Sequence, residues 1–367
     1  MGTFWKRHAK LHLWLAADLC LLGAFWLLRG NRAWMNALAE RVTDPLRRTA
    51  GRVCYRVDFS VMEALGVLLA LAAAAYLVWS VRAVVRAAGR RRDRAYSALL
   101  GALCAALSIY AGFCLLWGVS FWTDSFQDRS GIRAEPVDQE DLLAVTEYFA
   151  ERLAESGAQV PRDEVGLFAV LREEILADSV RVYDALEREF PFLEFDDPGV
   201  KPMAFSRLMS ILDFTGFYCP WTGESNVNVD SPACLLPATV SHELAHQRGI
   251  ASEQECNFLA VLASTASGLS AYEYSGWLMG YIHLGNALYR VDPDAYWAIR
   301  ESLPEEVRAD LAYNNAYWRQ FQGTVAQTVS NKVYDTSLKA YGDEWGIQSY
   351  GTVTDLLVTY YKDFAGA

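Results

Sequence analysis

The stretch that decides the fold runs from Ser241 to Gly249 and reads Ser-His-Glu-Leu-Ala-His-Gln-Arg-Gly. On an α-helix, His242 and His246 lie one turn apart and point the same way. Two imidazoles at this spacing can both bind Zn²⁺, at about 2.0–2.1 Å from it. Glu243, next to the first histidine, is placed to take a proton from water as a general base. The stretch therefore predicts a helix that carries a zinc site.

The residues around this stretch support a buried helix with defined ends. Pro237 lies just before it, and Gly249 stands where a C-terminal cap belongs. Leu244 and Ala245 lie between the two histidines and favour a buried position for the helix. The alternative is a helix with two ordinary core or surface histidines and no metal. Histidine is scarce, with five in the chain, so a chance match of this pattern is on the order of one in a hundred.

A catalytic zinc needs a third protein ligand and one open position. Glu253 and Glu255 are the candidates. Ser252 and Glu255 have the spacing of a capping box, which would give Glu255 a structural role at the start of a second helix. Glu253 would then begin that helix, with Asn257 one turn further on the same face, where its amide could orient a liganding histidine. This favours Glu253, with Glu255 as the alternative.

Charge divides the 367-residue chain into two parts. Residues 1–121 hold 16 Lys/Arg and 6 Asp/Glu, a net charge of +10, whereas residues 122–367 hold 17 and 38, a net charge of −21. Because nucleic-acid binding needs Lys and Arg to neutralise phosphates, the acidic second part is not expected to bind nucleic acid. We expect a membrane anchor in residues 1–121 and a catalytic domain in residues 122–367.

The basic part contains three apolar runs, each close to the length of about 20 residues that spans a bilayer. They cover residues 12–28, 59–81 and 96–121 and predict three transmembrane helices. Asp18 lies inside the first run, where we expect it to be protonated or hydrogen-bonded at a helix interface. The arginines between the second and third runs place that loop in the cytoplasm, so the acidic domain is expected on the extracytoplasmic side.

The acidic part is predicted to be mainly α-helical with a small β element. Residues 138–158 and 162–190 have helical spacing, and residues 208–228 mix β-formers with turn residues, which predicts one or two short strands. Residues 257–289 are apolar but interrupted by polar side chains, and we expect two buried helices there instead of a fourth span. Cys219 and Cys234 flank a turn-rich segment and could form a disulfide if the region is extracytoplasmic.

The sequence also resembles known families. His-Glu-x-x-His followed by the Glu253–Asn257 string resembles the gluzincin pattern of membrane-linked metallopeptidases, with Asn257 in place of the usual Asp. The resemblance implies a zincin-like domain in which Glu253 is the third zinc ligand. More closely, the chain is similar to an uncharacterised family of bacterial membrane proteins. That similarity rests on the stretch from Thr215 to Asn228, on His-Glu-Leu-Ala-His-Gln-Arg-Gly and on Glu255–Leu259, and it implies a bacterial cytoplasmic membrane protein.

Further site residues follow by analogy with zincins, in which an edge strand before the metal helix pairs with the substrate backbone. Residues 224–228, with Glu224, Asn226 and Asn228, are the candidate substrate strand, and an ordinary buried turn is the alternative. His283 could donate to an oxyanion or be a core histidine. Tyr350, in a segment of small residues, is another candidate oxyanion donor.

Together these features predict a membrane-anchored zinc metallopeptidase that uses Glu243 as its general base on a peptide or protein substrate. Two alternatives remain open from the sequence. One is a zinc-binding sensor or scaffold without proteolytic activity, and the other is a metal-dependent amidase that acts on cell-wall peptides.

Overall fold

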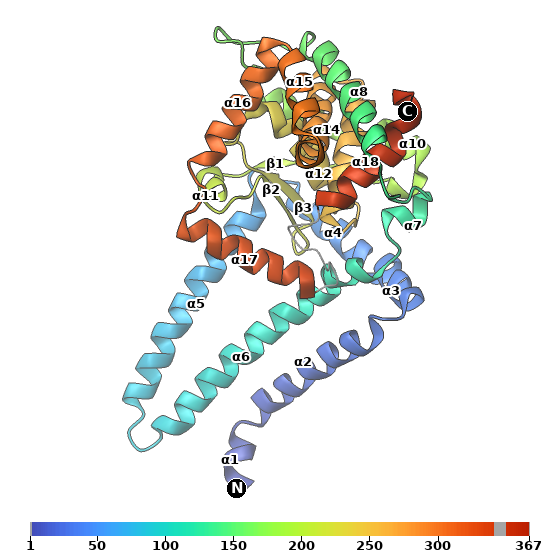
Figure 1. The fold of residues 1–367 in the computed structure, drawn as a ribbon. Coiled ribbons are helices and arrows are strands. Elements are labelled where there is room, and N and C mark those ends of the chain that lie inside the picture. The colour runs from blue at the N-terminus through green and yellow to red at the C-terminus, as the bar shows by residue number, and fades with distance from the viewer. Residues whose placement is uncertain (1, 341–349, 367) are drawn as a thin grey trace. The chain divides into compact units, whose positions relative to one another are not determined.

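The computed structural model describes residues 2–340 and 350–366 (Figure 1). By contacts the chain forms two compact units. The first comprises Met1–Ala50, Val61–Thr123 and Pro220–Thr222, and the second comprises Gly51–Ser60, Asp124–Cys219 and Gly223–Ala367. The division after Thr123 lies close to the boundary expected from charge and hydropathy. Residues 51–60, however, belong with the second unit, a feature that local composition does not reveal.

Three helices of the first unit are long and apolar enough to cross a membrane: α2 (Ala9–Leu28), α5 (Val61–Arg86) and α6 (Arg91–Leu116). These candidate spans agree in number and order with the three predicted ones. The third was predicted to reach residue 121 but ends earlier, because Trp117 leaves the helical conformation and a separate 3₁₀ helix η2 (Gly118–Trp122) follows. The other elements that begin in this unit are α1 (Gly2–Arg7), α3 (Arg32–Leu38), the π-helix η1 (Ala39–Thr43) and α4 (Asp44–Cys54).

The carboxylate inside the first span is hydrogen-bonded at a helix interface, as predicted. The hydroxyl of Ser108 on α6 donates to both carboxylate oxygens of Asp18 on α2, at 2.9 and 3.1 Å. A carboxylate among apolar helices is costly unless it has such a partner. This contact therefore fixes the packing of α2 against α6.

The second unit is mainly helical with one small sheet. Before the sheet it contains α7 (Phe126–Ser130), α8 (Gln139–Gly157), α9 (Arg172–Asp178), η3 (Ser179–Arg181), α10 (Asp184–Glu189) and η4 (Pro191–Leu193). Beyond the sheet come η5 (Ala233–Leu235), α12 (Leu236–Gln247), α13 (Glu253–Ala266), α14 (Ser270–Val291), α15 (Pro293–Ser302), α16 (Glu305–Arg319), α17 (Val325–Ala340) and α18 (Tyr350–Ala365). The two buried helices expected over residues 257–289 are confirmed as α13 and α14.

One helix prediction is wrong. Residues 162–190 were expected to be helical, but they contain a β-bridge between Arg162 and Phe168 and only short helices, α9, η3 and α10. The apolar residues of this segment turn into the core separately: Val170, Ile175, Val182 and Leu186 are all buried. Burial of these side chains thus overrides the helical spacing of the sequence.

Helix α14 lies at the centre of the second unit, packed against α8, α12, α13 and α18 (Figure 1). Three of its tyrosines, Tyr272, Tyr274 and Tyr281, are almost fully buried. Gly280 permits a close approach of α14 to α8, because a Cβ at this position would lie 2.1 Å from the ring of Phe149 on α8. These contacts form the apolar support on which α12 and α13 rest.

The sheet has three strands in the order β1-β3-β2: β1 (Lys201–Pro202), β3 (Glu224–Val227) and β2 (Gly216–Cys219). Strand β3 pairs with β1 in parallel and with β2 in antiparallel orientation. The short strands predicted over residues 208–228 are confirmed, and the helix α11 (Ser206–Ile211) precedes them. Cys219 and Cys234, considered above for a disulfide, are not bonded to each other.

A buried ion pair holds residues 51–60 to this sheet. The ammonium of Lys201 lies 2.7 Å from the carboxylate of Glu224, and it also donates to the carbonyls of Cys54 and Phe59 at 2.8 and 2.9 Å. Both side chains are buried. The Lys201 ammonium therefore connects the sheet to a segment that lies far from it in the sequence.

We expect Lys201→Met to lower the free energy of unfolding by about 3–5 kcal/mol, because it leaves the Glu224 carboxylate buried without its cation. Denaturant unfolding of the purified protein in detergent would measure the loss. Lys339→Met is the matched control, since Lys339 pairs with Asp335 at the surface. That control should change stability by less than about 1 kcal/mol, and equal losses in the two variants would contradict the prediction.

Candidate metal centre

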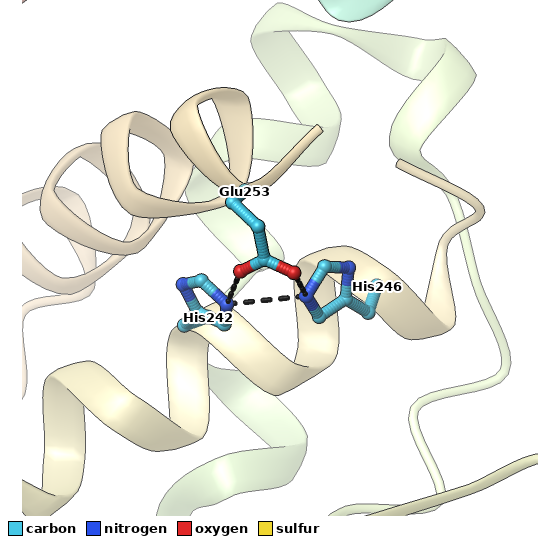
Figure 2. A group of neighbouring side chains, drawn as sticks. All are labelled: His242, His246 and Glu253. Carbon is cyan, nitrogen blue, oxygen red and sulfur yellow. Dashed lines mark hydrogen bonds and ion pairs between the residues drawn. The ribbon is translucent and has the colours of Figure 1, made fainter. Parts of the chain in front are cut away.

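Two helices, α12 and α13, bring three potential metal ligands together. Nε2 of His242 lies 3.1 Å from Nε2 of His246, and the Glu253 carboxylate lies 3.2 Å from the first nitrogen and 3.4 Å from the second (Figure 2). A tetrahedral zinc with bonds of about 2.0–2.1 Å separates its ligand atoms by roughly 3.3–3.4 Å. The three side chains therefore fit one ion, and within the described part of the chain they form the one such cluster found.

The outer nitrogens of both imidazoles are held by hydrogen bonds. Nδ1 of His242 lies 2.9 Å from the amide oxygen of Asn257, and Nδ1 of His246 lies 2.8 Å from the carbonyl of Ile250. Both oxygens accept, so Nδ1 of each ring carries a proton and Nε2 is the atom left to bind a metal. Metal-binding histidines usually have this arrangement.

The end of α12 creates the second of these contacts. Gly249 adopts φ +92° and donates to the carbonyl of His246, and the N–H of Ile250 donates to the carbonyl of Ala245. This is a Schellman motif, which needs a left-handed residue and therefore favours glycine. The predicted cap at Gly249 is confirmed, and the reversal turns the Ile250 carbonyl back to His246.

The two candidate glutamates on α13 have different surroundings. Glu255 accepts from the backbone N–H groups of Phe126 and Gln127 at 2.9 and 3.1 Å, so its carboxylate caps the start of α7. Ser252 caps α13 through the N–H of Glu255, but the Glu255 side chain does not return to Ser252 as a full capping box requires. Glu253 alone faces the histidines, whereas Glu255 points to another helix.

The charge of Glu253 suits a cationic ligand. Burial alone would raise its pKa, but the imidazoles of His246 and His242 hold the pKa of Glu253 well below its usual value. The hydroxyl of Tyr334 on α17 also donates to this carboxylate. Burial, followed by the neighbouring Glu253, raises the pKa of Tyr334, which therefore stays protonated as a donor.

Tyr334 was not predicted as a site residue. It lies 81 residues after Glu253, on a helix whose local pattern gives no sign of a metal site. The ring of Phe214 packs edge-on against the ring of Tyr334, with the ring centroids 5.6 Å apart.

Two residues were predicted as oxyanion donors. Tyr350 begins α18, but its side chain lies outside the described part of the chain. His283 on α14 remains a candidate, and burial followed by the charge of His242 lowers its pKa to about 4.

Glu243 lies beside the cluster, buried against β2. Burial raises the pKa of Glu243 to about 7, and a backbone hydrogen bond from Tyr218 partly opposes this. Among the described residues its Oε2 has no hydrogen-bond partner, although the atom is buried. Gly216 makes room for the side chain, because a Cβ at this position would lie 2.4 Å from Oε1 of Glu243. A buried acceptor of this kind is suited to receive a proton.

The prediction that residues 224–228 form an edge strand for substrate is wrong. Strand β3 is central, with both of its backbone edges paired by β1 and β2. The side chains are also engaged: Glu224 pairs with Lys201, Asn226 donates to the carbonyl of Glu224, and Asn228 donates to that of Phe214. Chain order placed the strand next to the metal helix, but it could not show that β2 folds back to its outer side.

Strand β2 is therefore the edge strand beside α12. The N–H of Asn228 donates to the carbonyl of Thr215 at 2.8 Å, directly before the pair Gly216–Val227. Since hydrogen-bonded and non-hydrogen-bonded pairs alternate in an antiparallel ladder, the N–H and C=O of Gly216 point away from β3. The backbone contact of Tyr218 with Glu243, two residues further on, agrees with this orientation.

The last residues of the predicted motif serve the structure. Gln247 donates to the hydroxyl of Tyr55 at 3.1 Å, and this hydroxyl in turn accepts from the backbone N–H of Ser225. The guanidinium of Arg248 pairs with the carboxylates of Glu187 and Asp197. These two contacts anchor the end of α12 to the surrounding segments.

Comparison with known proteins gave one family. No curated protein and no solved structure matched the chain. A family model described as a protein of unknown function (DUF3810) matches residues 40–358, most of the chain, including the histidines, Glu253 and Tyr334. The chain therefore belongs to this family of proteins of unknown function.

Proposed function

We propose that this protein is a membrane-anchored, zinc-dependent metallopeptidase with a zincin-like site. The observation that carries the proposal is the convergence of His242, His246 and Glu253 beside Oε2 of Glu243, a buried atom with no hydrogen-bond partner in residues 2–340 and 350–366. A zinc ion bound there would supply a Lewis acid that polarises a carbonyl and lowers the pKa of water.

The residues of the chain divide the remaining work. His242 and His246 would hold the ion through Nε2, oriented by Asn257 and by the Ile250 carbonyl. Oε2 of Glu243 would accept a proton from the attacking water, and Glu243 would later deliver that proton to the leaving amine. Burial of the Glu243 carboxyl raises its pKa, which favours the acceptance of a proton from water.

An edge strand next to the general base supports a peptide as the substrate class. The outward N–H and C=O of Gly216 could pair with an extended peptide backbone, as in other cases where a strand is added to a sheet edge. Such pairing would hold the scissile carbonyl near Glu243, which contacts the same residue. We place this activity on the extracytoplasmic side of a bacterial membrane, following the arginine distribution and the family resemblance.

Glu243→Gln should reduce peptide hydrolysis by about 10²–10⁴-fold while zinc remains bound, because it removes the general base and none of the ligands. Mass spectrometry of products from a mixed peptide library, with the protein in detergent, would measure the rate. Glu147→Gln, on the exposed surface of α8, is the control and should retain full activity. Hydrolysis by Glu243→Gln at the wild-type rate would refute the proposed mechanism.

Zinc content should separate the ligand from its neighbour on α13. We expect about one zinc per wild-type chain by elemental analysis, and loss of the metal in His242→Ala and Glu253→Ala. Glu255→Gln should keep its zinc and lose stability instead, since its carboxylate caps α7. Retention of zinc in Glu253→Ala together with its loss in Glu255→Gln would reverse the assignment.

Gly216→Ala should lower the hydrolysis rate by about 10²-fold without loss of zinc. The added Cβ displaces the Glu243 carboxylate, and a displacement of about 1 Å of a catalytic group can have an effect of this size. Gly351→Ala is the matched control, because a Cβ at Gly351 meets nothing within 4 Å. If both variants hydrolyse peptides at the wild-type rate, the close approach of Glu243 to Gly216 has no role in activity.

A further inference from the structure

An apolar groove of about 540 Å³ lies between α17 and the segment that joins α11 to β2. Leu212 and Phe214 line one side, and Val325, Val329 and Val333 line the other. Clefts of about 300–1,000 Å³ are typical of ligand sites. The remaining lining residues are Ala326, Ser330 and Tyr334, so no lining side chain carries a charge.

The valines of α17 form a stripe that the fold does not bury. Val325, Val329 and Val333 recur every four residues and therefore share one helix face. Their exposed fractions are 82%, 57% and 63%. In an acidic domain, an apolar face of this kind indicates a surface that a ligand or partner covers.

Residues on both sides of the groove connect it with the candidate metal centre. Tyr334 lines the groove, and its hydroxyl donates to the ligand Glu253. On the other side, Phe214 lies two residues before Gly216, the residue in contact with Glu243. Both sides of the groove therefore lead to the atoms that would perform the reaction.

Polar contacts hold α17 in place over this groove. The carboxylate of Asp213 accepts from the side-chain amides of Gln327 and Asn331 at 2.8 and 3.1 Å. Gln327 and Asn331 alternate along α17 with the valines, so one side of the helix binds Asp213 while the valine stripe lines the groove. The width of the groove is thus fixed by these contacts.

We propose that this groove is a specificity pocket that accepts a large apolar side chain of the substrate, next to the scissile bond. The proposal rests on the peptidase function proposed above and adds the substrate class. A peptide paired with the edge of β2 at Gly216 would lie beside Phe214 and could direct a side chain into the groove. A charged side chain would be disfavoured, because it would lose part of its hydration without gaining a charged partner.

Binding to the hydrolytically impaired protein tests the pocket separately from catalysis. The full-length Glu243→Gln protein, in lipid nanodiscs, is mixed with a polar dodecapeptide that carries one central photo-leucine. We expect light-induced crosslinks at residues 325–334 or 212–214, mapped by mass spectrometry. An unlabelled peptide with Leu at that position should compete at least about tenfold better than one with Ser, the size expected for burying a leucine side chain.

Val329→Arg in the same protein should weaken binding of the Leu peptide at least about tenfold and abolish the preference for Leu over Ser. Val165→Arg is the matched control, since Val165 is 75% exposed and lies outside the groove. Retained zinc in both variants would verify that the site is folded. Crosslinks at other residues, to lipid alone or to a second copy of the chain would overturn the proposal, as would a Leu preference that survives Val329→Arg.

The two proposals can fail separately. If the groove binds the Leu peptide as expected but wild-type protein hydrolyses no peptide, the pocket stands and the peptidase function is lost. If wild-type protein cleaves peptides without preference for an apolar residue near the bond, and Val329→Arg leaves the products unchanged, the function stands and the pocket is refuted.

Discussion

The pairing of α12 with α13 across the reversal at Gly249 is the constraint on which the site depends. The left-handed glycine ends α12, and the next turn of chain starts α13 in the direction that brings Glu253 over the two histidines. The same reversal supplies the Ile250 carbonyl that fixes the ring of His246. Since both helices pack against the buried helix α14, the core of the unit sets the position of the three potential ligand atoms.

The surroundings of this pair follow from the need to satisfy buried polar groups. Glu255 cannot stay unpaired inside the protein, and it caps α7. Arg248 and Gln247 likewise find Glu187, Asp197 and Tyr55. Each contact ties α12 or α13 to a different segment of the chain, so the motif also holds these segments together. Some buried polar atoms stay without a hydrogen-bond partner in the described part of the chain, and Oε2 of Glu243 is the one that lies beside the three potential ligands.

How much could be predicted from the sequence depended on the separation of the residues involved. The spacing of His242 and His246, and of Glu253 and Asn257, is a helical repeat, so local pattern was enough to place them. The three apolar spans were equally local. Contacts between distant segments determine the roles of Tyr334 and Gly216 and the order of the strands. A single sequence has no periodic pattern that reveals such contacts. The helix predicted over residues 162–190 is wrong because several separate side chains of this segment are buried in the core, and tertiary packing overrides helical propensity.

The ligand cluster has a further consequence for how the protein acquires its shape. His242, His246, Glu253 and Asn257 lie within 16 consecutive residues, so closing the loop between them costs little chain entropy. Such a hairpin of helices can form early and quickly, because short-range contacts precede long-range ones. The sheet edge and α17 join it from far along the chain. The binding of a metal, as proposed, is therefore expected to accompany local assembly, whereas the features that would select a substrate are completed last.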